Sequence, residues 1–329
     1  MATQSGPLTS QTRPTAGLLP YLRIARFDHW IKNVFVLPGL LVALTVSSRV
    51  DWPALAIHFV IGLLAVGFIA SSNYVINEVM DAPYDHHHPT KHLRPIPSGQ
   101  ISLPYAYIEW LLLMAIGLGL SYLVSRPFLW TMLVLWVMGL IYNIPPVRTK
   151  DLPYFDVLSE SVNNPLRMLA GWYIVRPVSA PPLSLLLSYW MIGCFFMATK
   201  RFAEYREIAN PERSSAYRRS FRFYTEQSLL VSIMFYSSFA MLMLGAFIIR
   251  YRLECILGFP LVALLMAVYL SLAFKPDSAV QRPEGLYREP ALVAVATAAS
   301  VVLTVLLFVD IPVLYRWFAP LKAGLIPRT

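Results

Sequence analysis

Long runs of apolar residues alternate with short polar segments along nearly the whole chain. A helix that crosses a membrane needs roughly 20 mostly apolar residues. Stretches of about this character lie near residues 32–48, 54–76, 103–124, 127–145, 155–175, 182–199, 227–249, 254–273 and 290–309. Because they follow one another without a soluble break, we predict a single all-α, polytopic membrane domain with about nine transmembrane helices.

The fifth stretch differs from the others because polar residues interrupt it, in the segment SESVNNPLRM. Polar side chains inside a span usually face a cavity rather than lipid. Outside the spans, we expect a disordered polar tail over residues 1–20 and a C-terminal tail over residues 311–329. The first tail lacks the apolar core of a cleaved signal peptide. The membrane domain is therefore expected to occupy residues 21–310.

Composition supports the assignment to a membrane. Of the 329 residues, 57% are hydrophobic and only 14% are charged, whereas soluble domains average about 25% charged residues. The two cysteines, Cys194 and Cys255, stand in apolar surroundings. They indicate neither a disulfide framework nor a cysteine-based metal site.

The net charge of +9 changes the interpretation of the loops. In a soluble protein this excess would indicate nucleic-acid binding, but in membrane proteins Lys and Arg gather in cytoplasmic loops. A cytoplasmic N-terminus puts most of the 27 Lys and Arg residues on that side, in the tail and near residues 77–102, 146–154, 200–226 and 274–289. We therefore predict an odd number of spans, every chemically rich loop on the cytoplasmic face, and no nucleic-acid partner.

The segment NEVMDAPYDHHHPTKHLR, at residues 77–94, carries the first candidate site. Steps of four residues put Asn77, Asp81 and Asp85 on one face of a helix. Three oxygen-bearing side chains in a row suit Mg²⁺, a hard cation that takes a few carboxylates plus substrate phosphates. Bases follow at Lys91 and Arg94, as expected for a metal-bridged pyrophosphate. The alternative is a solvated charge cluster at a helix end.

The histidine triplet His86-His87-His88 invites a zinc interpretation. Consecutive histidines on a regular helix cannot all converge on one metal. We therefore expect surface histidines near phosphate rather than a histidine metal site.

Two further polar groups follow near the fifth stretch. The loop YNIPPVRTKDLPYFD contributes Tyr142, Arg148, Lys150, Asp151 and Asp156. Asn163, Asn164 and Arg167 come next, inside the stretch itself. An arginine within a membrane is costly unless it is paired or hydrated. Its partner is predicted to be either Asp156, as an internal ion pair, or a ligand phosphate.

A fourth polar group surrounds residues 200–226. Lys200, Glu204 and Glu207 share a helix face by spacing, next to Arg201, and Arg218, Arg219, Arg222 and Tyr224 close the segment. These charges could form helix-stabilising pairs or set the topology, but guanidinium groups also suit bidentate phosphate binding. At the N-terminal end, Trp30 is typical of a membrane interface. Lys32 and Asn33 could extend their polar ends to the membrane surface, or they could reach the polar opening that the other charged loops are expected to form.

On these motifs the chain resembles the UbiA superfamily of membrane prenyltransferases over about residues 20–310. NEVMDAPYD at 77–85 is similar to the family's first Asp-rich motif, with Glu78 in place of the usual Asp. Five stretches resemble the decaprenyl-phosphate phosphoribosyltransferase branch in particular. They are WIKN at 30–33, the run from Asp85 to Ile96, K-x-x-P-x-x-D at 150–156, L-R-x-x-A-G at 166–171 and K-R-x-x-E at 200–204. NNPLR departs from the glycine-containing segment expected before the arginine.

The resemblance implies nine helices around a central cavity in the bacterial inner membrane. It implies transfer of a 5-phosphoribosyl group from phosphoribosyl pyrophosphate to a polyprenyl phosphate, dependent on Mg²⁺ or Mn²⁺. KRFAEYRE stands where prenyltransferases carry a second Asp-rich motif, which suits a donor with an extra phosphate. The metal ligands would be Asn77, Glu78, Asp81 and Asp85. Catalysis would involve Asn77, Asp81, Asp85, Lys150 and Asp156, and substrate binding Lys32, Lys91, Arg94, Tyr142, Arg167, Lys200, Arg201 and Glu204.

Two other functions stay open at this point. A UbiA-type enzyme could use the same metal site to move a prenyl group from a prenyl diphosphate to an aromatic or other small acceptor. A transporter of anionic solutes would be expected to show internal repeats and broken helices at mid-membrane. The charged groups lie on one face and no convincing repeat is present. Membrane lipid surrounds the protein in each case, and a homo-oligomer is left open.

Overall fold

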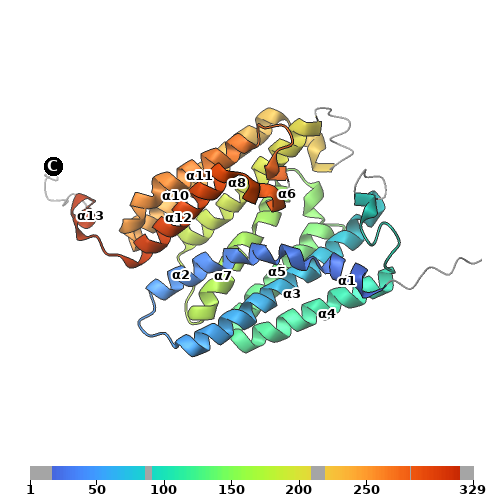
Figure 1. Ribbon diagram of the computed structural model, residues 1–329, viewed down its shortest axis with the longest axis horizontal. Helices are drawn as coiled ribbons and strands as arrows, with labels where there is room; N and C mark the ends of the chain where they lie inside the picture. Colours follow the sequence, from blue (N-terminus) through green and yellow to red (C-terminus); the bar gives the residue numbers. More distant parts are fainter. Residues whose placement is uncertain (1–16, 86–90, 209–218, 282, 319–329) are drawn as a thin grey trace, which may run out of the picture.

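The computed structural model describes residues 17–85, 91–208, 219–281 and 283–318, and all regular structure within these ranges is helical (Figure 1). This confirms the all-α prediction. The longer helices are α1 (Leu18–Ala25), α2 (Leu37–Thr45), α3 (Trp52–Asp85), α4 (Leu103–Val124), α5 (Arg126–Asn143), α6 (Phe155–Ser161), α7 (Asn163–Val175), α8 (Leu183–Ile208), α10 (Glu226–Tyr251), α11 (Phe259–Leu272), α12 (Pro290–Phe308) and α13 (Pro312–Trp317).

Short 3-10 helices join these elements and continue some of them. They are η1 (Phe27–Val36), η2 (Lys91–Leu93), η3 (Thr149–Asp151), η4 (Arg219–Phe223), η5 (Leu253–Gly258), η6 (Ala279–Gln281) and η7 (Pro283–Arg288). Local signals explain several helix starts. Ser125 caps α5 by accepting from the Phe128 amide, and Thr225 and Ser228 form a capping box at α10.

Seven helical segments within the described ranges are long and apolar enough to cross a membrane. They are Leu18–Thr45, Trp52–Asp85, Leu103–Val124, Leu183–Ile208, Glu226–Tyr251, Leu253–Leu272 and Pro290–Phe308. The chain is thus an integral membrane protein. The other two predicted stretches fold as α5 and as the α6–α7 pair, which complete the bundle but do not reach that length and composition. The count of nine spans is therefore not confirmed.

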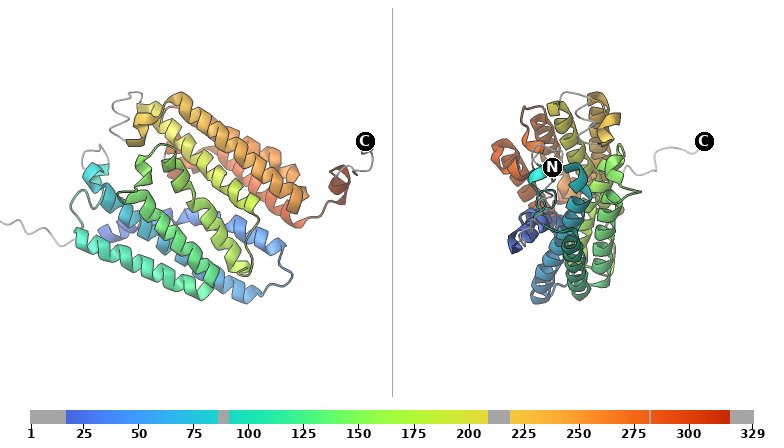
Figure 2. Two further views of the ribbon diagram at one scale, coloured as in Figure 1. Left: turned by 180° about the vertical axis from the view of Figure 1, so that it is seen from behind. Right: turned by 90° about the vertical axis from the view of Figure 1, so that its right-hand side faces the viewer.

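The helices form two adjoining groups, α1 to α7 and α8 to α12, that lie side by side in both views (Figures 1 and 2). Their outward faces carry exposed apolar side chains, such as Leu112 on α4 and Leu242 on α10, as expected where lipid is the solvent. Inward faces hold tightly packed clusters, including Phe128 with Leu135. In lipid such interfaces are held by van der Waals packing rather than by exclusion of water.

The closest approach lies between α7 and the η1–α2 segment. A Cβ atom added at Gly171 would stand 1.9 Å from the Val36 carbonyl oxygen, and one at Gly39 would stand 1.8 Å from that of Met168. Both positions need glycine because the backbones are in contact, as is common for small residues between membrane helices. This contact fixes α7, and the residues it carries, against the N-terminal segment.

Two helices extend further than expected from the apolar pattern. Residues 77 and beyond were predicted as loop, but α3 continues to Asp85, and α8 likewise continues to Ile208. With 34 residues, α3 is about 50 Å long, whereas the hydrocarbon layer is about 30 Å thick. Its last turns therefore rise beyond the apolar layer at the end of the bundle where the polar loops gather, here called the polar end.

Candidate functional site at the polar end of the bundle

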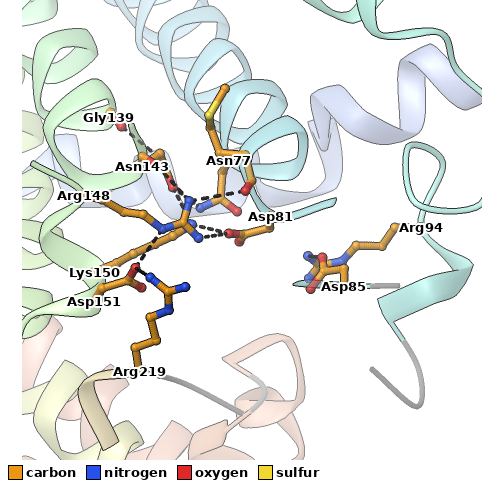
Figure 3. Close-up of polar contacts among 11 residues, drawn as sticks. Asn77, Asp81, Asp85, Arg94, Gly139, Asn143, Arg148, Lys150, Asp151 and Arg219 are labelled. Atoms are coloured by element: carbon orange, nitrogen blue, oxygen red, sulfur yellow. Dashed lines mark hydrogen bonds and ion pairs between the residues drawn. The ribbon is translucent and has the colours of Figure 1, made fainter. Parts of the chain in front are cut away.

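The last turns of α3 supply the acidic face of the site. Asn77, Asp81 and Asp85 follow one another at four-residue spacing on a continuous helix, which confirms the predicted arrangement. Their side chains serve different neighbours (Figure 3). Asp81 points toward the loop after α5, whereas Asp85 pairs with Arg94 from the loop after α3, at 2.7 Å.

Asp81 is held by two cations from the loop that follows α5. Arg148 Nη2 lies 2.9 Å from Asp81 Oδ1, and Lys150 Nζ donates to the same oxygen. Lys150 Nζ also donates to Asn143 Oδ1 at 3.1 Å, and Asn77 Nδ2 donates to that oxygen at 2.6 Å. Asn77, Asp81 and Lys150, which were predicted to act together, are therefore in one hydrogen-bonded network (Figure 3).

The backbone of that loop is shaped to bring the cations in. Arg148 has φ of +24°, a conformation uncommon outside glycine. Its Nη1 donates to the carbonyl oxygens of Met80 at 3.3 Å and Asn143 at 3.1 Å. One arginine thus joins the end of α5 to the end of α3. Tyr142, a predicted substrate-binding residue, is buried with its ring 5.9 Å from Lys150 Nζ.

Glu78 does not share the direction of its neighbours on α3. Its side chain is only 2% exposed and accepts from the Ile96 amide at 3.2 Å. Arg26 from the end of α1 lies 3.9 Å away. Glu78 therefore anchors the loop that carries Arg94. Its role as a metal ligand stays a prediction.

Asp156 has a different environment from the one predicted for a catalytic group. It is 0% exposed, and its oxygens accept from Arg201 Nε at 3.2 Å, Ser220 Oγ at 3.2 Å and Tyr224 Oη at 2.6 Å. Burial, reinforced by the charge of Asp156, raises the pKa of Tyr224 well above its usual range, so its hydroxyl stays protonated and donates. Asp156 consequently fastens η4 to α6 and α8.

The predicted substrate ligands on α8 belong to the same internal group. Arg201 is 3% exposed, and its Nη1 donates to Glu204 Oε2 at 2.9 Å. Lys200 Nζ lies 3.9 Å from the other Glu204 oxygen and is half-buried. Asp156 and Arg201 are both enclosed by protein, which suits a positioning role, and their direct contact with substrate stays a prediction. Lys200 is the more accessible of these cations.

η4 brings a cation to the site that was not among the predicted site residues. Arg219 lies 3.7 Å from Asp151 Oδ2, the oxygen that also accepts from Arg148 Nε at 3.0 Å. The guanidinium groups of both arginines stack on Tyr84, at 5.0 Å for Arg148 and 5.3 Å for Arg219. Two guanidinium groups therefore converge at the mouth, beside Asp81 (Figure 3).

Asn143 was also missed by the sequence reasoning. It is a single amide at the end of a helix, and only its pairing with Asn77, 66 positions earlier, reveals a role. Arg219 is one of several arginines in a basic segment of the sequence. Composition alone does not tell which of these arginines lies near Asp81 and Asp151.

Four predicted features have other contacts than Asp81 or lie outside the residues that the structure describes. Lys32 Nζ is 3.3 Å from His29 Nδ1 and 6.0 Å from the ring centre of Tyr74 on α3. The predicted interface residue Trp30 donates its indole N–H to Ser71 Oγ at 2.9 Å, so its ring packs on α3. The triplet at 86–88 and the side chain of Lys91 lie outside the described residues.

Arg167 lies in the bundle interior and is 8% exposed. Its Nε has no hydrogen-bond partner among the residues that the structure describes. The first predicted partner, Asp156, is engaged by Arg201 instead. The internal ion pair between Arg167 and Asp156 is thus not formed, which leaves the second predicted alternative, a ligand phosphate.

The residues on α3 fit a magnesium ion that is completed by its substrate. Within the described ranges, no three side chains of the His, Cys, Asp and Glu types converge as a preformed metal site. Mg²⁺, however, commonly binds through one or two carboxylates plus substrate phosphates and water. Asp81 and Asp85 are of this kind, and their present cationic partners match the phosphates that such a substrate would bring.

The fold and site thus define a helical integral membrane protein with an acidic helix face opposed by several cations. The sequence pattern of the UbiA prenyltransferase family matches residues 33–287. A decaprenyl-phosphate phosphoribosyltransferase from Mycobacterium tuberculosis is 27% identical over 220 residues, 66% of this chain and 70% of that protein. A 4-hydroxybenzoate octaprenyltransferase from Pectobacterium atrosepticum is 28% identical over 180 residues, 54% of this chain and 58% of that protein.

Among solved structures, a UbiA homologue from Archaeoglobus fulgidus bound to DMAPP and Mg²⁺ superposes with a TM-score of 0.67. The two chains are 20% identical, and the superposition covers 99% of that chain and 87% of this one. The chain belongs to the UbiA prenyltransferase family, and it is accordingly a membrane-embedded transferase.

Proposed function

We propose that the protein transfers a 5-phosphoribosyl group from phosphoribosyl pyrophosphate to a polyprenyl phosphate and releases pyrophosphate. The relative from M. tuberculosis carries the name of this activity and aligns over two thirds of both chains. The polar end supplies an acidic helix face for a metal-bound pyrophosphate, and cations from three other elements for the remaining charge.

The observation that carries the proposal is that two carboxylates near α8 are already bound by a cation of the protein. A prenyl diphosphate site with a second metal would need accessible carboxylates there. In the described part of the chain, the carboxylates of Asp156 and Glu204 are instead bound by buried Arg201. The same region offers Lys200 and Arg219 to the mouth. One acidic face and a surplus of cations suit a donor that carries an additional phosphate.

In the proposed mechanism, the side chains of Asn77, Asp81 and Asp85 would hold Mg²⁺, and the ion would supply neutralisation of the negative charge on pyrophosphate. Arg148, Lys150 and Arg94 exchange their carboxylate partners for phosphate oxygens and stabilise the same charge. Lys91, Lys200, Tyr142 and Lys32 complete the predicted binding set. Asp156, Arg201 and Glu204 act by positioning η4 and the loop after α5.

The chemical step is a substitution at the anomeric carbon of the donor. The bond from this carbon to the pyrophosphate oxygen breaks, and the leaving group takes the electron pair. An oxygen of the ionised polyprenyl phosphate forms the new bond, which turns a phosphate monoester into a diester. An ionised monoester needs no base to remove a proton, in agreement with a mouth rich in cations rather than in free carboxylates.

The membrane in which the protein lies, and its orientation there, follow from the same chemistry. A soluble, multiply charged donor reaches the polar end from water, and the basic loops there agree with a cytoplasmic face. We therefore place the protein in the bacterial inner membrane with its N-terminus and site loops cytoplasmic.

Prenyl transfer from a prenyl diphosphate to a small acceptor is the second candidate. The relative from P. atrosepticum is named for that class of reaction, and the structure from A. fulgidus holds DMAPP with Mg²⁺. This function would use the same acidic face of α3. It would leave unexplained the neutralised carboxylates near α8.

The test uses the purified full-length protein in detergent with Mg²⁺. Radiolabelled phosphoribosyl pyrophosphate is offered with a polyprenyl phosphate, and the label is followed into the organic phase. We expect lipid-linked label that fails to appear when EDTA is added. The same preparation is given a prenyl diphosphate with 4-hydroxybenzoate. Turnover of that pair without phosphoribosyl transfer would overturn the proposal and establish the second candidate.

A further inference from the structure

Arg167 poses an electrostatic problem that the protein alone does not resolve. Its side chain is 8% exposed, its Nε has no partner, and no anionic side chain pairs with it within the described ranges. A buried cation without a counter-ion is strongly disfavoured in a low-dielectric interior. The acidic residue that was predicted to pair with Arg167, Asp156, already pairs with Arg201.

A second polar group accompanies it on the same face of α7. Asn163 precedes Arg167 by four residues, so the two side chains are neighbours on the helix. The Oδ1 atom of Asn163 is also buried without a hydrogen-bond partner in the described part of the chain. The same amide carries an N–H₂ beside this oxygen, and rotation about its Cβ–Cγ bond can turn that donor toward an anion.

The contacts of α7 identify the elements that pack against the helix near Arg167. Gly171, four residues beyond Arg167, lies against the Val36 carbonyl. Asn33 stands one 3-10 turn before Val36, on the same side of η1, and is buried. The hydroxyl of Tyr189 on α8 donates to the Phe35 carbonyl at 3.4 Å. Both η1 and α8 pack against α7, so this polar face of α7 borders two elements that also carry polar groups.

The depth of this group separates it from the acidic face of α3. Arg167 follows Asp156 by 11 residues and lies on α7, beyond the break between α6 and α7, whereas the acidic face lies at the end of α3. Long side chains on a helix lean toward its N-terminal end, so the guanidinium reaches back toward the polar end from within the apolar layer. A group bound there would be inside the membrane yet adjacent to the mouth.

We propose that Arg167, Asn163 and Asn33 form a second anion site, which binds a phosphate monoester within the membrane interior. The inference rests on the proposed function only for the identity of the molecule that carries this phosphate. Both substrates end in a phosphate monoester: the lipid headgroup of the acceptor and the 5-phosphate of the donor. Pyrophosphate itself belongs at Asp81 and Asp85. The charge of the ligand then completes a site whose cation has no partner in the protein.

The test measures binding rather than turnover. Equilibrium binding of farnesyl phosphate, farnesol and ribose 5-phosphate is measured on full-length protein in detergent, for the wild type and for Arg167→Gln. Loss of a charge-assisted contact to phosphate is expected to weaken binding of one monoester by about 10- to 100-fold. Farnesol, which has no phosphate, should bind both proteins equally. Arg222→Gln removes an equal charge from an exposed position on η4 and should change nothing.

The two ligand arms identify the source of the phosphate. Weaker farnesyl phosphate binding assigns the site to the acceptor, and weaker ribose 5-phosphate binding assigns it to the donor. Equal binding of both monoesters by wild type and Arg167→Gln would overturn the proposal. If Arg167→Gln does not fold, Arg167→Lys keeps the charge and should weaken the same monoester by a smaller factor; unchanged affinity in that variant together with Asn163→Ala would also refute it. Because binding is read without turnover, failure of phosphoribosyl transfer leaves this test intact.

Discussion

At the scale of single residues, the site is organised by carboxylates that are already neutralised. Asp81 Oδ1 is shared by Arg148 and Lys150, and Asp85 is paired with Arg94. Such pairs leave little net charge at rest. When a metal-bound pyrophosphate enters, the carboxylates can turn to the metal and the cations to the phosphates, so both partners keep a neighbour of opposite sign.

Alanine at Asp81 or Asp85 should abolish turnover while leaving a folded protein. Either change removes a metal ligand and leaves cations without their resting partner. Steady-state transfer assays with Mg²⁺ measure the loss, and size-exclusion chromatography confirms the folded state. Glu78→Gln serves as the contrast, since its carboxylate holds the Ile96 amide: it should lower stability more than it lowers metal affinity. Retained activity in Asp81→Ala would remove this residue from the metal site.

Arg219→Gln should raise the KM for the pyrophosphate-bearing donor by roughly fivefold, with a smaller effect on kcat. The side chain is 59% exposed, so its contact with phosphate is screened by water and worth about 1 kcal/mol. Arg222→Gln, on the same 3-10 helix, is the matched control and should behave as wild type. Equal KM values in the two variants would show that Arg219 does not contact the donor.

At the scale of elements, backbone contact and one buried acid hold the site together. The glycines of α2 and α7 let these helices touch, which sets the position of Arg167. Asp156 fastens η4 through Ser220 and Tyr224, which in turn sets the position of Arg219. The positive φ of Tyr154, +64°, is accompanied by a bond from its amide to Tyr224 Oη at 2.6 Å. These connections place side chains from distant segments in one mouth.

Gly171→Ala should destabilise the protein, because the new methyl would stand 1.9 Å from the Val36 carbonyl oxygen and must push two helices apart. Overpacking of this kind costs about 1–3 kcal/mol. The midpoint of thermal unfolding in detergent measures the effect. Gly119→Ala on α4 is the control, since nothing lies within 4 Å of its added Cβ; alanine there should be neutral or slightly stabilising. Equal midpoints would contradict the close contact.

At the scale of the whole molecule, the bundle separates a polar end from an apolar belt. Every element of the acidic face and its opposing cations lies at the end where α3 and α8 finish and α4 begins. The opposite end is joined by the turn between α7 and α8. In the proposed function the polar end carries out the chemistry, so its orientation decides which compartment supplies the donor.

Introduced cysteines should report this orientation. Cys194 and Cys255 are buried, so a membrane-impermeant thiol reagent has little native background. Gln100→Cys at the polar end should be labelled only in inside-out vesicles. Val178→Cys, in the α7–α8 turn, should be labelled in intact cells. The reverse pattern would place the site outside the cytoplasm and contradict a cytoplasmic donor.

Much of the fold was predictable because the relevant signals are local. Apolar length identifies the helices, four-residue spacing puts Asn77, Asp81 and Asp85 on one face, and polar residues mark the segment with Arg167 as interior. The apolar pattern ends the spans near residues 76 and 199, whereas the helices continue to Asp85 and Ile208, because their last, charged turns rise beyond the apolar layer.

The amino-acid sequence alone is therefore enough to predict the class of protein, the acidic helix face and the excess of basic residues around it. The tertiary structure decided how the charges pair: Arg201 rather than Arg167 meets Asp156, Glu78 turns to the Ile96 amide, and Asn143 and Arg219 join the site. The physical reason is that periodicity depends on neighbours three or four residues apart. The pairing of buried charges depends on which of several equivalent groups, tens of residues apart, the packing of helices brings within a few ångströms.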